Sequence, residues 1–274
     1  MKKIKHIYLV QSENNLNFTH EENDSRIFIN AVWGESPKGK SLDARNLTMP
    51  EGRNLMFEYA TKNYEFDYLT FKDGDISFVK GSYDVYEKIV EKYKLPLYHS
   101  FDISDHAKGY MHKEIDYCFE RHKKKDKLIF MDWIDTCFCT FRKDIINDYM
   151  PWLTKFDYHN WWYSCFYLNI LGRIKGHMWA IVLDVQTDNH QHREYPKKYN
   201  REVGDIHHLI SRDFLKYIIS KNGINVNNTT LNKKFPWPIY MFTENKYLKE
   251  IKNNNHIKMF RKLNTGVAKY NEWK

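Results

Sequence analysis

Two aspartates separated by one glycine follow directly after an apolar run in the sequence YLTFKDGD. If the backbone is extended there, the side chains of Asp73 and Asp75 point the same way, because alternate residues of a strand share a face. Two like charges that close repel each other unless something positive lies between them, and a divalent cation with oxygen ligands would suit them. The alternative is a solvent-exposed turn, which the Lys-Asp-Gly-Asp sequence also favours.

A second polar group follows another apolar run, in the sequence MWAIVLDVQTDNHQHRE. Imidazole can complete a mixed oxygen and nitrogen site for Mn²⁺, and less well for Mg²⁺. If both apolar runs are strands of one sheet that end at the same edge, His190 or His192 could join the two aspartates in one metal site. A polar surface loop is the alternative for the two histidines.

The apolar pattern predicts the elements that would position these residues. Strands are predicted over residues 4–10, 26–33, 66–71, 127–131, 136–141 and 178–185. Helices are predicted over residues 48–63, 82–93, 142–150 and 158–171, the last closed by Gly172. A loop at residues 96–109 leads into a further, charged helix. The start of the first helix is the clearest signal, because Thr48 and Glu51 have the spacing of a capping box and Pro50 lies in the first turn.

This order of elements predicts an α/β fold with the acidic pair at the carboxyl end of a strand. In open parallel sheets, ligands bind at that edge. We expect one main domain over residues 1–202 and a helical, basic appendage over residues 203–274 that packs on it.

Composition restricts the class of protein and of partner. With 16% aromatic residues the chain can form a sizeable core, so it is not a disordered chain. The formal net charge of +8 favours an anionic partner, although it could also reflect a plain solvated surface. No run approaches the roughly 18 apolar residues that span a bilayer. We expect a soluble, cytoplasmic protein and leave peripheral membrane contact and oligomeric state open.

The four cysteines do not have the spacing of a zinc finger. They are Cys118, Cys137, Cys139 and Cys165. We expect them to be free and buried, which fits a reducing compartment.

The stretch GRNLMFEYATKNYEFDYLTFKDGDI resembles the core of GT-A-fold glycosyltransferases. In that superfamily an Arg-Asn pair opens a helix, and the strand that follows ends in an Asp-X-Asp motif. The matching residues are Arg53, Asn54, Asp73 and Asp75. The resemblance implies a GT-A, Rossmann-like, mixed and mainly parallel sheet flanked by helices. It spans roughly residues 4–195, is sharp only over residues 52–76, and assigns no particular family.

The resemblance also implies roles for the matching residues. Asp73 would face the ribose of a nucleotide sugar or the metal-bound waters, and Asp75 would ligate Mn²⁺ or Mg²⁺ on the diphosphate. His190 or His192 stands where such enzymes often take a further metal ligand. Arg53 and Asn54 would help to bind the donor. Lys72 departs from the acid or apolar residue that related enzymes often carry before the motif.

Sugar transfer makes further demands on the site. The leaving diphosphate gains negative charge, which a divalent ion and a nearby cation such as Arg53 would offset, unless this arginine is only an exposed helix residue. An inverting enzyme also needs a base on the acceptor hydroxyl. Asp135 and Asp157 are the candidates, with helix capping or a core salt bridge as the alternative for each.

Three tryptophans are candidates for contacts with the substrates. Trp33 is the last residue of the second predicted strand and could contact the nucleotide base. Trp161 or Trp162 could stack on a sugar, or fill the core, since aromatic side chains dominate core burial.

We therefore predict a metal-dependent glycosyltransferase of hexosyltransferase type, with a nucleotide-diphosphate sugar as donor and a glycan or glycoprotein as acceptor. UDP is expected from its frequency in the superfamily that the sequence resembles. A nucleotidyltransferase of sugar phosphates is one alternative, although no glycine-rich loop follows the first strand. A non-enzymatic protein that binds nucleic acid or glycans is another, although we expect no nucleic-acid partner because no such motif is present.

Overall fold

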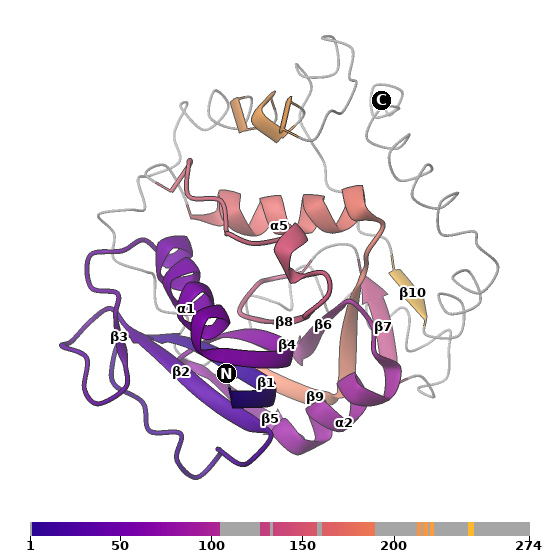
Figure 1. Cartoon of the computed structure of the whole chain (residues 1–274). Helices are drawn as coiled ribbons and strands as arrows, with labels where there is room; N and C mark the ends of the chain where they lie inside the picture. The colour runs from indigo at the N-terminus through magenta and orange to yellow at the C-terminus, as the bar shows by residue number, and fades with distance from the viewer. Residues whose placement is uncertain are drawn as a thin grey trace, which may run out of the picture.

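Both faces of the sheet are buried, as β1 (Lys2–Ser12) shows. Its successive side chains point to opposite faces, so Ile7 and Leu9 join one apolar cluster while Tyr8 and Val10 join another. Figure 1 shows the layers that result: α1 and α5 lie on one side of the sheet, and α2 lies on the other. A strand buried on both faces gives a nearly continuous apolar run, which is why the sequence IYLV was recognisable as a strand.

The computed structural model describes residues 2–104, 127–131, 134–157 and 161–189, together with residues 213–214, 216–218, 220–221 and 241–243. The elements before residue 105 are β1, β2 (Arg26–Val32), β3 (Leu42–Asp43), α1 (Met49–Asn63), β4 (Tyr64–Asp73), β5 (Ile76–Lys80), α2 (Tyr83–Tyr93) and β6 (Leu97–Asp102). The later elements are β7 (Leu128–Met131), β8 (Phe138–Arg142), a 3-10 turn (Ile146–Asp148), α5 (Trp162–Lys175), β9 (Trp179–Asn189) and β10 (Met241–Thr243).

The sheet is mixed, as predicted, with the strand order β10-β7-β9-β6-β8-β4-β1-β2-β3 and with β5 paired to β9. The run from β3 through β2 and β1 to β4 is parallel, and so is the pair of β6 and β9. The other pairs are antiparallel. β8 is antiparallel to β4 and β6, β7 is antiparallel to β9 and β10, and β5 is antiparallel to β9. Parallel pairing is thus concentrated in the N-terminal half rather than in the whole sheet.

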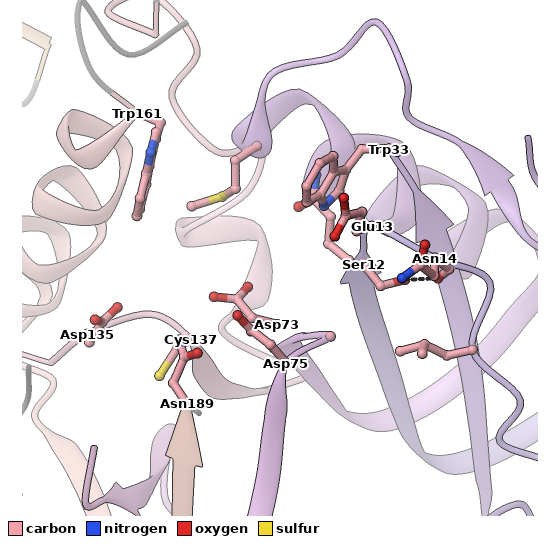
Figure 2. Close-up of a pocket in the computed structure, with 14 residues that line it drawn as sticks. Ser12, Glu13, Asn14, Trp33, Asp73, Asp75, Asp135, Cys137, Trp161 and Asn189 are labelled. Atoms are coloured by element: carbon pink, nitrogen blue, oxygen red, sulfur yellow. Dashed lines mark hydrogen bonds between the residues drawn. The ribbon is translucent and has the colours of Figure 1, made fainter. Parts of the chain in front are cut away.

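This topology brings several strand ends to one edge. Because β8 is antiparallel to both β4 and β6, those two strands run in the same direction, and β9 is parallel to β6. The carboxyl ends of β1, β4, β6 and β9 therefore meet at one edge, beside the amino end of β8. Asp73, Cys137 and Asn189 come together there (Figure 2).

The predicted start of α1 is confirmed. The Thr48 hydroxyl accepts a hydrogen bond from the backbone N–H of Glu51 at 3.3 Å, and the Glu51 carboxylate accepts one from the Thr48 N–H at 2.8 Å. The helix packs its buried residues Met56 and Ala60 into the same cluster as Ile7 of β1. The capped start and the buried face of α1 fix the position of the helix. Arg53, one turn into α1, therefore lies beneath the strand ends.

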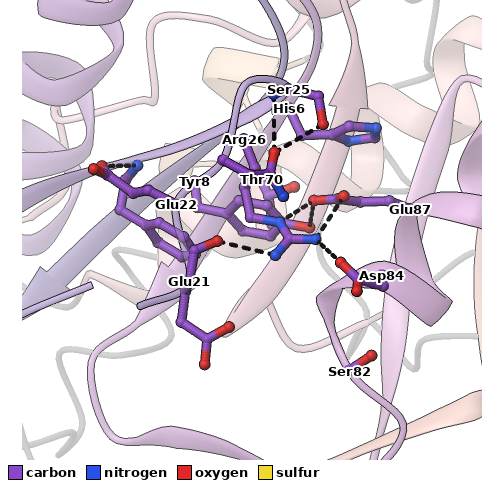
Figure 3. A network of polar contacts seen from close by, with 12 residues as sticks. His6, Tyr8, Glu21, Glu22, Ser25, Arg26, Thr70, Ser82, Asp84 and Glu87 are labelled. Carbon is purple, nitrogen blue, oxygen red and sulfur yellow. Dashed lines mark hydrogen bonds and ion pairs between the residues drawn. The ribbon is translucent and has the colours of Figure 1, made fainter. Parts of the chain in front are cut away.

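A buried ion network attaches α2 to the other face of the sheet (Figure 3). The Arg26 guanidinium donates hydrogen bonds to both oxygens of Glu87 at 2.6 and 2.8 Å and also pairs with Asp84. The Tyr8 hydroxyl donates to Glu87 at 3.1 Å. Arg26 is 4% exposed, so its charge depends on these partners rather than on water.

Two local predictions are wrong. Residues 97–102, expected to lie in a loop, form the wholly buried strand β6, whose polar residues His99, Ser100 and Asp102 hide the usual apolar pattern. Gly172 does not end its helix, because α5 continues to Lys175 and ends before Gly176, which has a positive φ of 72°. Gly172 instead allows a close approach, since a Cβ there would lie 3.3 Å from the His177 carbonyl oxygen.

Other predictions have partial outcomes. The helix expected over residues 142–150 is only the 3-10 turn, and β5 was not anticipated. Cys137, Cys139 and Cys165 are free and buried, as expected, whereas Cys118 and the charged helix lie outside the described residues. None of the helices that the structure describes is long and apolar enough to cross a lipid bilayer.

The predicted domain boundary at residues 202 and 203 also lies outside the described residues, so the division stays a prediction. The described pieces beyond it pack against the rest of the described chain. Phe214 and Ile218 are buried in the cluster on the α1 side, with the Phe214 ring 5.4 Å from that of Phe156. β10 pairs with β7.

We predict that Arg26→Met destabilises the protein by about 3–5 kcal/mol, because it leaves the Glu87 carboxylate buried without its cation. Urea unfolding at pH 7 measures the change. Arg45→Met is the control, since Arg45 and Asp43 form a solvent-exposed pair that contributes little to stability. Equal losses in the two variants would contradict a structural role for the buried network.

Candidate active site

A pocket of about 240 Å³ opens at the edge where the strand ends meet. Acidic and amide side chains occupy its floor, and a tryptophan stands at each end (Figure 2). The residues that line it are Gln11, Ser12, Glu13, Asn14, Leu16, Trp33, Met49, Asp73, Gly74, Asp75, Asp135, Cys137, Trp161 and Asn189.

The acidic pair lies in this pocket rather than in an open turn. Asp73 is the last residue of β4, in register with Gln11 of β1, and both carboxylates face the cavity in Figure 2. The Gly74 N–H donates to the Gln11 carbonyl at 2.8 Å, and a Cβ on Gly74 would lie 2.4 Å from the Ser12 Cβ. A glycine is therefore needed between the aspartates, because this turn presses against the end of β1.

Arg53 is fully buried beneath the pocket and is not an exposed helix arginine. Its Nη2 donates to Asp73 Oδ1 at 2.5 Å, and its Nη1 donates to the Thr136 carbonyl at 3.0 Å. The guanidinium carbon also lies 4.3 Å from the centre of the Trp152 ring. Arg53 thus orients Asp73 and joins β4 to the segment before β8; it does not line the pocket, so the predicted direct contact with a donor has no support from its position.

Burial and the neighbouring charges set the protonation state of Asp73. Burial raises the pKa of Asp73 to about 6, against the lowering effect of Arg53, and the nearby Asp75 and Asp135 raise it further. Asp73 is therefore mostly ionised at neutral pH.

Lys72 adds a second buried cation next to the acidic pair. Its side chain is 5% exposed, and its ammonium donates to the Asp73 carbonyl at 3.1 Å. Burial lowers the pKa of Lys72 to about 8, while Asp73 and Asp75 counteract this change. Lys72 therefore places a positive charge close to the acids.

Asp135 lies across the pocket from the acidic pair (Figure 2). It belongs to the irregular segment of residues 134–137, which precedes β8. Because β8 is antiparallel to β4, its amino end lies next to the carboxyl end of β4, and the Asp73 N–H donates to the Cys137 carbonyl at 2.9 Å. The structure thus brings Asp135 and the acidic pair into one site.

Asp157 and Asn54 do not line the pocket. The Asp157 carboxylate accepts hydrogen bonds from the hydroxyls of Thr48 at 2.5 Å and Ser164 at 3.2 Å, which ties the start of α1 to α5. Asn54 binds both backbone polar groups of Trp152, at 2.6 and 3.0 Å. The predicted roles of Asp157 as a base and of Asn54 as a donor contact therefore lack support, because these polar atoms hold the scaffold together.

The two tryptophans that line the pocket stand on opposite sides of the acidic floor. Trp161 is on the side of Asp135, and Trp33 is beside Glu13 (Figure 2). The side chain of Trp162 lies outside the described part of the chain. The prediction did not include Glu13, although the polar sequence QSENN after the first strand was a signal for it.

The donor atoms in the pocket suit a hard divalent cation. The carboxylates of Asp73 and Asp75 and the amide of Asn189 supply oxygen ligands of the kind that Mg²⁺ and Mn²⁺ accept. No three His, Cys, Asp or Glu side chains within the described ranges are grouped closely enough to hold a metal ion by themselves. The set therefore fits an ion shared with phosphate oxygens and water rather than a closed protein cage.

The predicted ligands His190 and His192 lie outside the described residues. Their neighbour Asn189, the last residue of β9, lines the pocket. The participation of either histidine in a metal site stays a prediction.

No protein-family model and no curated protein matches the chain. Among solved structures, S. aureus TarS 1-349 in complex with UDP-GlcNAc is similar to it, with a TM-score of 0.48 and 9% identity over 79% of this chain and 67% of that one. A structure of S. aureus TarS has a TM-score of 0.41 and 10% identity over 85% of this chain and 46% of that one. A197 from STIV has a TM-score of 0.37 and 9% identity over 67% and 84%. Similarities this distant carry no argument about activity.

We predict that Asp157 makes stability fall with rising pH. Burial raises the pKa of Asp157 from 3.8 to about 7, so between pH 4 and 7 the folded protein binds more protons at this group than the unfolded chain does. The free energy of unfolding therefore decreases across that window. Asp157→Asn removes the titration, so urea unfolding should show the variant gaining stability relative to wild type as the pH rises. The same pH dependence in both proteins would contradict the buried carboxyl.

Proposed function

We propose that the protein is a metal-dependent glycosyltransferase that moves a sugar from a nucleotide-diphosphate sugar, with UDP as the nucleotide, to a hydroxyl of a glycan or glycoprotein. The observation that carries the proposal is the placement of three carboxylates. Asp73 and Asp75 lie on one side of the pocket and Asp135 on the other, at the carboxyl edge of the sheet. The resemblance of the segment around Asp73 to GT-A enzymes supports the same assignment.

The positions of the lining residues suggest how a nucleotide sugar would be oriented in the pocket. The diphosphate would lie at its centre, next to the acidic pair and a shared cation. A base must be near the anomeric carbon, so the sugar and the acceptor belong on the side of Asp135 and Trp161. The nucleoside then belongs at the other end, where Trp33 can stack on the base and Asn14 offers hydrogen bonds.

Each residue then has a defined task. A bound Mn²⁺ or Mg²⁺, held by Asp75 with Asp73 and Asn189 close by, would offset the negative charge that the leaving diphosphate acquires. Asp135 takes the proton of the acceptor hydroxyl while that oxygen forms its bond to the anomeric carbon and the bond to the phosphate oxygen breaks. Trp161 presents an aromatic face to the apolar C–H groups of a sugar. Arg53 keeps Asp73 ionised and aimed into the pocket.

We predict that a nucleotide sugar raises the melting temperature only in the presence of Mn²⁺ or Mg²⁺. At a ligand concentration of 100 times Kd the gain is about 2.7 kcal/mol. Asp75→Ala should abolish the gain, because it removes the carboxylate proposed to hold the cation. A thermal-shift panel of nucleotide sugars, with and without metal, makes the measurement.

The control for this experiment is Asp148→Ala, because Asp148 is an exposed acid outside the pocket that pairs with Lys175. It should respond to donor and metal as the wild type does. Equal shifts in wild type and Asp75→Ala would count against the site.

We predict that Asp135→Asn lowers kcat by about 10²–10⁴-fold, since the acceptor hydroxyl loses its base, and leaves the donor-induced thermal shift intact. Steady-state kinetics provide the test, with a nucleotide sugar that raises the melting temperature in the thermal-shift panel as the donor. Asp157→Asn should keep kcat close to the wild-type value, because that carboxylate faces Thr48 and Ser164. A loss confined to Asp157→Asn would reverse the assignment.

A further inference from the structure

We propose that Asn169 and His99 are positioning residues that fix the segment of residues 134–137 against the pocket and thereby hold the Asp135 carboxylate in place. The inference rests on the proposed function for the consequence, but the contacts themselves do not depend on it. Neither side chain lines the pocket, and both are fully buried.

The segment needs such partners because it is buried and irregular. Buried N–H and C=O groups are almost always hydrogen-bonded, and this stretch comes before β8 begins to pair with its neighbours. Ile134, Thr136 and Cys137 are at most 2% exposed, so water does not supply the missing bonds. Side chains from other elements must therefore satisfy the backbone.

Asn169 of α5 binds both backbone groups of Ile134. Its Oδ1 accepts from the Ile134 N–H at 3.2 Å, and its Nδ2 donates to the Ile134 carbonyl at 3.0 Å. Nδ2 also donates to the Cys165 carbonyl at 3.1 Å, one turn earlier in the helix. This two-point contact fixes the residue that precedes Asp135.

His99 of β6 contacts the end of the segment. Its Nδ1 contacts the Ser100 carbonyl. Its Nε2 lies 3.9 Å from Cys137 Sγ, and that thiol lies 3.8 Å from Asp102 Oδ2. A polar cluster at this depth is costly unless its members bind one another and the backbone, which is the arrangement seen.

Two further contacts complete the series. Arg53 of α1 donates to the Thr136 carbonyl, and the Asp73 N–H of β4 donates to the Cys137 carbonyl. Ile134, Thr136 and Cys137, on either side of Asp135, are thus each held by a different element. A base placed in this way is preorganised, and a displacement of about 1 Å can cost on the order of 100-fold in rate.

The first test does not involve activity. Hydrogen exchange measured by mass spectrometry should show that Asn169→Leu lowers protection of the peptide containing Ile134 by about tenfold or more, because its N–H loses its acceptor. Tyr98→Phe is the control, since it removes a buried hydroxyl that binds Val90 and Leu95 on the other face of β6. Unchanged protection in Asn169→Leu, or the same loss in both variants, would overturn the inference.

The second test concerns catalysis. Asn169→Leu and His99→Leu should lower kcat by about 10- to 100-fold, with the donor KM and the donor-induced thermal shift unchanged. His99→Gln keeps a side-chain donor and should recover part of the loss. Equal proportional effects on kcat and on donor binding would indicate general damage and overturn the inference. If Asn169→Leu does not fold, Asn169→Ala removes the same acceptor and donor with a smaller side chain and serves in both tests.

The two tests separate this inference from the proposed function. If no nucleotide sugar is a substrate of the wild-type protein, the proposed function fails, and the exchange measurement alone decides whether Asn169 holds the segment. If transfer occurs but the exchange data show no change, the function stands and the positioning role is wrong.

Discussion

One buried charge connects the parts of this site. The Arg53 guanidinium lies in the interior, against the ring of Trp152, and a cation at that depth must have ionic or carbonyl partners. Its two partners are the Asp73 carboxylate and the Thr136 carbonyl. The requirement to satisfy Arg53 therefore fixes an acid of the pocket and the segment that carries Asp135 relative to each other.

The topology of the sheet places the groups that Arg53 connects at one edge. Parallel strands place the carboxyl ends of β1, β4 and β9 at one edge, and the antiparallel β8 brings its amino end to the same place. Acids from two distant parts of the sequence can then face a single cavity. Hydrogen bonds from Asn169 to Ile134, together with the contact of His99 with Cys137, secure the segment that the strand ladders leave unpaired. Within the buried strand β6, His99 faces Cys137 of this segment, Ser100 binds Thr187 of β9, and Asp102 accepts from the Ser104 N–H.

Much of this arrangement was predictable where the signal is local. The capping box of Thr48 and Glu51, the apolar run of β1 and the acids at the end of β4 each depend on residues close together in the sequence. The acidic pair was identified as a candidate for these reasons, whereas Asp135 was a candidate because of the resemblance to GT-A enzymes. The predictions failed where a contact spans the fold. Nothing near Asn54 or Asp157 indicates that Trp152 and Thr48 would bind them, and β6 reads as a loop because its buried polar residues have distant partners.

The account is tested most directly by a crystal structure of the wild-type protein with UDP and Mn²⁺, with the metal located from its anomalous signal. We expect the diphosphate between the acidic pair and Asp135, the manganese beside Asp75, and Arg53 still bound to Asp73 and Thr136. A nucleotide bound outside this pocket, or Arg53 released from Asp73 to contact the phosphates itself, would contradict the account.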